Sequence, residues 1–317
     1  MKHIQRKDIH IISRHSNLNE TAIRKVLEEQ VYNDQASWKK FLRLFFISLG
    51  IGFTVAGIVF FFAYNWANLH KFAKIGLIEG LLITTTALAL LPKLQLTTRN
   101  IILTGATVLV GVLYAVFGQV YQTGANAYDF FLAWTVFASL WVLVANFAPL
   151  WLLYLVLINT TLLLYAQQVA NYWPDALEPT ILFFINTAVL VTAILLVRYR
   201  KAIVPAWFLQ IVALGCASYA TLGIVNGIFD RYLGVLPVLG ALTAIAYGAG
   251  IWFGLKTRDR FYLSIIAFSL ITIVAALLLK ISYQAGMLLL VGLFVVASVT
   301  LVIKYLIDLQ QKWKNEQ

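Results

Sequence analysis

The sequence predicts an all-α fold, a polytopic bundle of about ten transmembrane helices with a short N-terminal cytoplasmic helical hairpin. Of the 317 residues, 61% are hydrophobic and 12% are charged, whereas soluble domains are about 45–50% apolar and about 25% charged. The mean hydropathy is +0.84, and the apolar residues gather in stretches of roughly 20, the length that crosses a bilayer core. This composition excludes a soluble enzyme and a disordered chain, and the single cysteine, Cys216, excludes a disulfide scaffold.

Ten stretches qualify as spans, since a hydrocarbon core about 30 Å thick needs roughly 17–25 apolar residues at 1.5 Å rise each. Ala148 and Pro149 alone separate the fourth and fifth, which predicts either a tight helical hairpin or one long broken helix. The predicted spans are 42–64, 73–91, 101–118, 130–147, 150–166, 180–197, 202–224, 234–254, 261–279 and 285–306.

The basic residues predict the orientation. With ten spans and both termini in the cytoplasm, 20 of the 24 Lys and Arg lie inside, and only Lys71, Lys74, Arg231 and Lys280 lie outside. Basic loops resist translocation, so this asymmetry supports both ten spans and two cytoplasmic termini. The net charge of +11 is then explained by contact with an anionic leaflet, and no nucleic acid is expected as a partner.

The chain divides into a cytoplasmic amphipathic head, residues 1–40, a bundle, residues 41–306, and a cytoplasmic tail, residues 307–317. Apolar spacing in the head predicts two short helices that break around Ser16-Asn17. A DNA-reading helix-turn-helix has a similar pattern, but a hairpin of forty residues has little core of its own. We expect the head to pack on the membrane face, on another copy or on a partner subunit.

Three pairs of short motifs recur at nearly one spacing and suggest an internal duplication. Tyr121-Gln122-Thr123-Gly124 recurs as Tyr283-Gln284-Ala285-Gly286, Thr98-Arg99-Asn100 as Thr257-Arg258-Asp259, and Asn65 as Asn226. Residues 41–147 and 202–306 would then be parallel repeats, with spans 150–197 inserted between them.

Glu79 is the one acid inside a predicted span. An ionisable group in hydrocarbon costs at least a few kcal/mol, so it should face the interior, be protonated or pair with a base such as Lys71 or Lys74. The sequence leaves open whether it is a coupling or substrate-binding carboxylate or a buried structural hydrogen bond.

Three polar, aromatic loops lie on the predicted outer side: residues 64–71, 118–129 and 167–178. Amides and aromatic rings in one place suit sugars, amines or peptide-like ligands; the alternative is that they cap helix ends and form the interfacial aromatic belt. The candidate ligand-binding residues are Asn65, Trp66, Gln119, Tyr121, Gln122, Asn126 and Asp129.

Enzyme motifs are missing from the sequence. There is no glycine-rich phosphate loop, no Gly-x-Ser-x-Gly elbow and no His-Glu-x-x-His helix, and the four histidines lack metal-ligand spacing. We therefore expect no enzymatic activity, no metal and no cofactor, although an intramembrane enzyme without a known motif stays open.

Three motifs resemble the bacterial membrane proteins grouped as domain of unknown function 2157, over roughly residues 10–155. They are Ala63-Tyr64-Asn65-Trp66, the loop Gly118–Asn126, and Phe131-Leu132-Ala133-Trp134. Where the family loop often ends in Gly-Asp, this chain has Gly124-Ala125-Asn126, and its first acid is Asp129. The resemblance implies an inner-membrane protein and supplies no reaction.

The leading hypothesis is that the protein transports or binds a small polar solute at an outward-facing site, with Glu79 as the coupling carboxylate. The alternative is a non-enzymatic membrane subunit or sensor whose basic head docks on a partner or on anionic lipid. The expected partners are the lipid bilayer, the solute, and a second copy or a membrane partner subunit.

Overall fold

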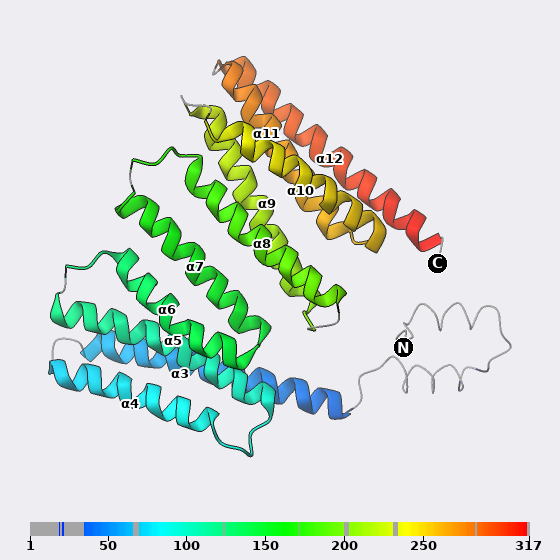
Figure 1. Cartoon of the computed structure of the whole chain (residues 1–317). Coiled ribbons are helices and arrows are strands. Elements are labelled where there is room, and N and C mark those ends of the chain that lie inside the picture. The colour runs from blue at the N-terminus through cyan, green and yellow to red at the C-terminus, as the bar shows by residue number, and fades with distance from the viewer. Residues whose placement is uncertain are drawn as a thin grey trace. The chain divides into compact units, whose positions relative to one another are not determined.

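The computed structural model describes residues 35–65, 70–122, 124–170, 172–199, 203–230, 234–282 and 284–315, together with Asn19 and Thr21. In this part of the chain there are ten helices, each long and apolar enough to cross a membrane, which confirms the predicted all-α fold with ten spans (Figure 1). They are α3 (Gln35–Asn65), α4 (Lys71–Ala89), α5 (Leu96–Tyr121), α6 (Ala127–Ala145), α7 (Ala148–Gln168), α8 (Leu177–Arg198), α9 (Ala206–Phe229), α10 (Leu236–Thr257), α11 (Arg260–Ile281) and α12 (Ala285–Asn315).

The predicted N-terminal hairpin lies outside the described residues. Of the predicted head, residues 1–40, the structure describes Asn19, Thr21 and residues 35–40, and the last of these already belong to α3. The first membrane helix therefore begins before the boundary at residue 41 that the sequence suggested.

The α6–α7 connection shows whether the fourth and fifth predicted spans form a hairpin or one broken helix. Helix α6 ends at Ala145, Asn146 takes the left-handed conformation with φ 42°, and Pro149 lies in the first turn of α7. The two helices pack against each other, and the Thr135 and Thr161 hydroxyl oxygens lie 3.1 Å apart. The stretch is therefore a tight antiparallel hairpin and not one broken helix.

By its internal contacts the chain divides into two units, residues 1–120 and residues 121–317. In the first unit, α3, α4 and α5 meet around Ile78 and Val116. Helices α3 and α5 approach closely at Gly105, where a β-carbon would lie 2.7 Å from Cγ2 of Ile51. At one end of this contact, the guanidinium of Arg43 donates to the side-chain oxygen of Gln95.

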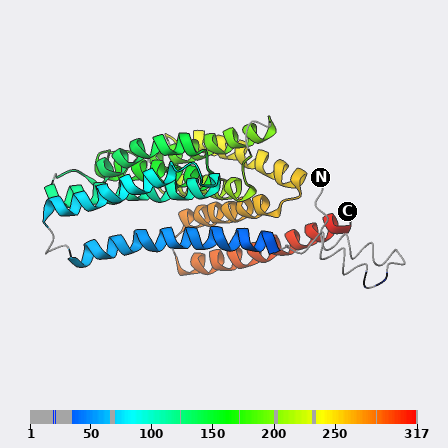
Figure 2. The ribbon, with the colours of Figure 1, turned by 90° about the horizontal axis from the view of Figure 1, so that it is seen from below.

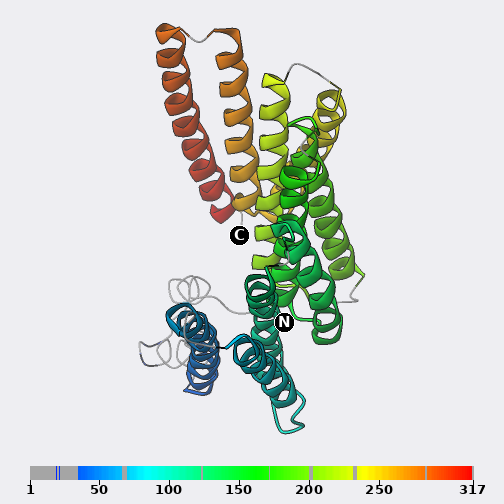
Figure 3. The same cartoon turned by 90° about the vertical axis from the view of Figure 1, so that its left-hand side faces the viewer.

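The second unit is built around α9, which packs against α7, α8, α10 and α11. Helix α6 packs on α7, and α12 packs on α11. Figure 3 shows α11 and α12 side by side and antiparallel, and Figure 2 shows the same two helices, in orange and red, from below. Small residues on α9 permit the close packing: a β-carbon on Gly223 would lie 2.7 Å from Cδ2 of Leu239 on α10.

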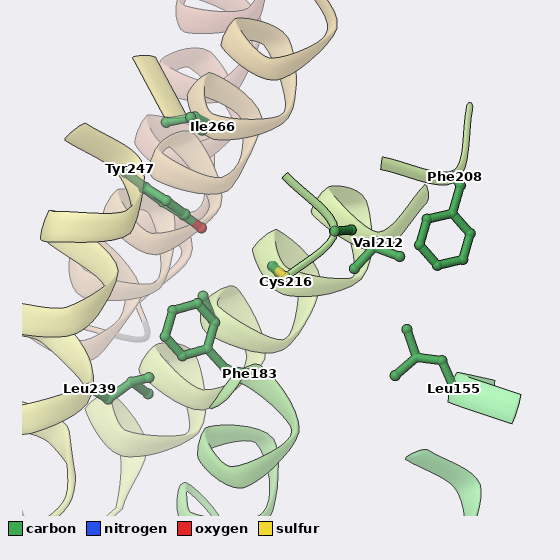
Figure 4. Close-up of a cluster of buried hydrophobic side chains, with 10 residues drawn as sticks. Leu155, Phe183, Phe208, Val212, Cys216, Leu239, Tyr247 and Ile266 are labelled. Carbon is green, nitrogen blue, oxygen red and sulfur yellow. The ribbon is translucent and has the colours of Figure 1, made fainter. Parts of the chain in front are cut away.

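The core of the second unit joins α7 to α11. In Figure 4, Tyr247, Ile266 and Leu239 lie on one side of Cys216, and Phe208 and Leu155 lie on the other. Many large apolar side chains instead lie on the surface; Leu289, for example, is 77% exposed. A continuous apolar surface is what lipid-facing helices require, so contact with the bilayer follows from the fold.

The proposed repeats stay a prediction. Their landmarks fall at the ends of helices, with Arg99 near the start of α5 and Arg258 just before α11. Tyr283, the second copy of the Tyr-Gln motif, lies outside the described residues.

Candidate functional site

A hollow of about 340 Å³ lies in the second unit, where α7 ends, α8 begins and α9 ends. Ligand pockets for small molecules are typically of about 300–1,000 Å³. The hollow is lined by Ala166, Gln167, Ala170, Trp173, Pro174, Asp175, Glu178 and Asn226. All of these residues belong to the described part of the second unit.

The connection between α7 and α8 is held in place by its own backbone. The N–H groups of Val169 and Ala170 both donate to the Tyr165 carbonyl, each at 2.9 Å, which closes α7. Leu177 N–H donates to the Pro174 carbonyl at 2.9 Å and opens α8. A further hydrogen bond joins the connection to α9.

Asn226 on α9 makes this hydrogen bond, in which its side-chain N–H donates to the backbone carbonyl of Asp175 at 3.1 Å. Asn226 lies one turn before the end of α9. Because its amide is bonded to the α7–α8 connection, the wall of the hollow is fixed by three helices rather than by one loop.

The lining has the chemistry of a site for a cation. Asp175 and Glu178 supply two carboxyl groups, Gln167 and Asn226 supply amides, and Trp173 supplies a half-buried indole ring. Among the described residues that line the hollow there is no lysine or arginine. Carboxylates attract an ammonium group directly, and the face of an indole ring is the best aromatic partner for a cation.

An aromatic chain links this hollow to the start of α6. The ring centroids of Tyr128 and Tyr165 are 5.2 Å apart, and those of Tyr165 and Trp173 are 5.6 Å apart. The Tyr128 N–H donates to the side-chain oxygen of Gln168 at 3.0 Å. Two of the three polar loops that the sequence placed on the outer side therefore meet, at the end of 118–129 and in 167–178.

The candidate residues at the end of α5 are exposed. Gln119 and Tyr121 lie in its last turn, and Gln122 follows with a positive φ of 44°. Asn65 is the last residue of α3, and Trp66 lies outside the described residues. The ligand-binding roles of these residues stay predictions.

Asn126 and Asp129 have a structural role. Asn126 is the N-cap of α6, and its backbone N–H donates to Oδ2 of Asp129 at 3.0 Å. A carboxylate three residues after the cap that reaches back in this way is the acid of a capping box. This is the helix-capping alternative that the sequence left open.

Glu79 lies on the exposed side of α4, while Lys74 and Ile78 lie on the buried side. Among the described residues Glu79 has no hydrogen bond or ion pair, and Lys71 and Lys74 are not at the i±3 or i±4 positions that meet on a helix surface. Its role as a coupling carboxylate stays a prediction.

Reasoning from the sequence left Gln167, Glu178 and Asn226 out of the candidate site. Glu178 belonged to a loop that was singled out, but Asn226 served only as a repeat landmark. A second polar feature was also missed: Asn159 and Asn186 form a reciprocal amide pair, with N···O distances of 3.2 and 3.0 Å. The signal for it was two amides inside otherwise apolar spans.

Among the described residues there is no group of three or more His, Cys, Asp or Glu side chains that could hold a metal ion.

The ten apolar helices, together with the polar motifs, are typical of a multi-pass membrane protein. Residues 18–151 match the family described as predicted membrane protein DUF2157. This match confirms the resemblance drawn from the Asn-Trp and Gly-Gln-x-Tyr motifs. It covers α3 to α6 and ends in the first turn of α7, so the hollow lies outside it. The chain matches no curated protein and no solved structure.

Proposed function

We propose that this membrane protein binds a small, positively charged polar solute in the hollow between α7, α8 and α9, as the first step of its transport. The observation that carries the proposal is the described lining, which has two acids, two amides and an indole, with no base among these residues. A primary amine or a quaternary ammonium fits such a lining, whereas an anion would meet like charge.

We propose further that the hollow faces outward. In the described part of the second unit, one base, Lys280, lies at the hollow's end, with its ammonium 5.7 Å from the Phe229 ring centre. The bases toward the opposite end are Arg198, Lys256, Arg258, Arg260, Lys304, Lys312 and Lys314. The end rich in basic residues is expected in the cytoplasm, which also places the C-terminus there.

Cysteine labelling in intact cells tests this orientation. In a Cys216→Ser background, Ser282→Cys marks the hollow's end and Lys314→Cys marks the opposite end. A membrane-impermeant maleimide should label Ser282→Cys in intact cells and Lys314→Cys only after permeabilisation. The reverse pattern would show that the hollow faces the cytoplasm.

Binding is tested with the purified full-length protein and four probes: ethanolamine, choline, glucose and glutamate. We expect the two cations to bind and the neutral and anionic probes not to. Glu178→Gln should weaken binding of the cations about tenfold or more, since a hydrogen bond to a charged group contributes about 1.5–3 kcal/mol. Asp308→Asn, which removes one negative charge from α12, is the matched control and should leave affinity unchanged.

The alternative function, a membrane subunit or sensor that docks through its basic head, concerns residues outside the described part of the chain. Because α3 begins at Gln35, its test is deletion of residues 1–34, which removes the head and leaves that helix whole. A carrier should keep cation binding after the deletion, whereas an adaptor should lose its partner.

A further inference from the structure

A second hollow, of about 650 Å³, lies at the opposite end of the second unit. It lies where α10 ends, α11 begins and α12 passes. Its lining is Thr257, Arg258, Asp259, Arg260, Phe261, Ser264 and Leu306. The set combines two guanidinium groups, two hydroxyls and an apolar wall.

Each of the two arginines donates a hydrogen bond to an acceptor on α12. Arg258, in the left-handed conformation with φ 56°, donates to the Trp313 carbonyl at 3.2 Å. Arg260 donates to the side-chain oxygen of Gln310 at 2.5 Å. A guanidinium has five N–H donors, so the bond to Gln310 engages only part of what Arg260 can offer.

The acid in this lining is already engaged as a helix cap. One oxygen of Asp259 accepts the Phe261 N–H at 2.9 Å, and the other accepts the side chain of Gln210 on α9 at 3.3 Å. Asp259 therefore fixes the start of α11 and ties it to α9. Of the charged side chains that line the hollow, two are positive and one is negative.

The depth of the hollow places it at the level of lipid headgroups. Gln210, which contacts Asp259, and Asn226, which lines the first hollow, are 16 residues apart on α9. At 1.5 Å per residue they are separated by about 24 Å, close to the thickness of the hydrocarbon core, about 30 Å. The two hollows thus open near opposite faces of the membrane.

The surroundings of the basic hollow are those of an interface. Trp252 on α10 is 60% exposed, and the ammonium of Lys256 lies 4.7 Å from the centre of its ring. Tyr305 on α12 is 62% exposed. Aromatic rings and snorkelling lysines at helix ends mark the boundary between headgroups and acyl chains.

From these observations we infer that this hollow binds an anionic phospholipid. The guanidinium groups of Arg258 and Arg260 attract the phosphate, and the half-buried side chains of Phe261 and Leu306 lie along the acyl chains. A soluble phosphate would use the same arginines but would gain nothing from the apolar wall. The site is separate from the cation hollow and stands or falls independently of it.

The test uses the full-length protein in detergent with phosphatidylglycerol, phosphatidylcholine or inorganic phosphate, read by native mass spectrometry and by the shift in thermal unfolding. Phosphatidylglycerol should bind at least tenfold more tightly than phosphatidylcholine. Arg260→Gln should remove most of that preference. Arg198→Gln, which removes a charge from the same end but outside the hollow, should retain it.

Three results would overturn the inference. One is an Arg260→Gln protein that still prefers phosphatidylglycerol, and another is an equal loss in Arg198→Gln, which would indicate unspecific attraction. The third is inorganic phosphate that stabilises the protein as strongly as the lipid, which would make the ligand a soluble anion. If Arg260→Gln does not fold, Leu306→Glu places a negative charge on the wall and should abolish the same preference.

Discussion

The amide pair between α7 and α8 offers the sharpest test of the packing. Asn186 is 2% exposed, and its Nδ2 donates to Oδ1 of Asn159 at 3.0 Å and to the Leu182 carbonyl at 2.8 Å. Its own Oδ1 accepts from Asn159 at 3.2 Å. Asn186→Leu removes all three bonds and leaves the amide of Asn159 facing an apolar side chain.

The expected cost of Asn186→Leu follows from that count. A buried polar group left without its partner costs about 1–3 kcal/mol, so the single variant should lose free energy of unfolding in that range. In Asn159→Leu/Asn186→Leu no amide is left unpaired, and the loss should be much smaller than the sum of the two single variants. Interhelical hydrogen bonds in membrane proteins average about 0.6 kcal/mol each and reach about 1.7, so a coupling near 1–2 kcal/mol is expected for two.

Thermal or steric-trapping unfolding of the four proteins in bicelles measures this cycle. The reasoning is refuted if the two single losses add up to the double loss within about 0.3–0.5 kcal/mol, the scatter seen for independent sites. A double variant that loses more than the sum of the two single losses would mean that the leucines clash, and would also refute it.

Four further experiments probe the packing of α9 and α10. Gly223→Ala should lower the free energy of unfolding by about 1–3 kcal/mol through overpacking, because the new β-carbon meets Leu239, which is fully buried. Gly240 has open space around it, so Gly240→Ala should stabilise α10 by up to about 1 kcal/mol. The same unfolding assay measures both variants. Cys216 is 8% exposed, so a maleimide should react with it only as fast as the protein unfolds; rapid labelling of the native protein would contradict the packing. Tyr247→Phe removes the hydroxyl that bonds to α11 and should cost about 0.6–1.7 kcal/mol, and an unchanged unfolding temperature would show that this bond contributes nothing.

The number of spans was predictable because it depends on properties local to each stretch. Length and hydropathy define each of the ten helices, and Pro149 with Asn146 marks the break between α6 and α7. The ends of the helices were less predictable from the sequence. Helix α3 begins at Gln35 and α12 continues to Asn315, in segments polar enough to be assigned to the head and the tail.

The central place of α9 could not be deduced from hydropathy, since all ten spans are apolar. Its signal was a stripe of small residues at intervals of three or four, where backbones can approach closely: Ala213, Ala217, Ala220, Gly223 and Gly227 are all buried. The cation hollow could not be predicted from hydropathy either. Glu178 and Asn226 are 48 residues apart, and only the packing of α8 on α9 brings them together.

The amide pair of Asn159 and Asn186 also offers a test of whether the cation hollow belongs to a carrier or to a receptor. Asn159 is eight residues along α7 from Gln167, and Asn186 is eight residues along α8 from Glu178, so the pair lies about 12 Å below the hollow on both helices. Leu155 on α7 and Phe183 on α8 belong to the buried apolar core. A solute that enters the hollow and crosses the membrane along α7 and α8 must therefore pass the amides.

A carrier and a receptor then respond differently to Asn159→Leu/Asn186→Leu. Binding of choline or ethanolamine should persist in both cases, because no lining residue is changed. Uptake into proteoliposomes should fall at least tenfold for a carrier that uses this seam, since an apolar plug replaces the only amides at that depth on these two helices. Uptake that continues at the original rate would exclude the α7–α8 seam as the path, while binding that disappears would mean that the hollow depends on the amides for its shape.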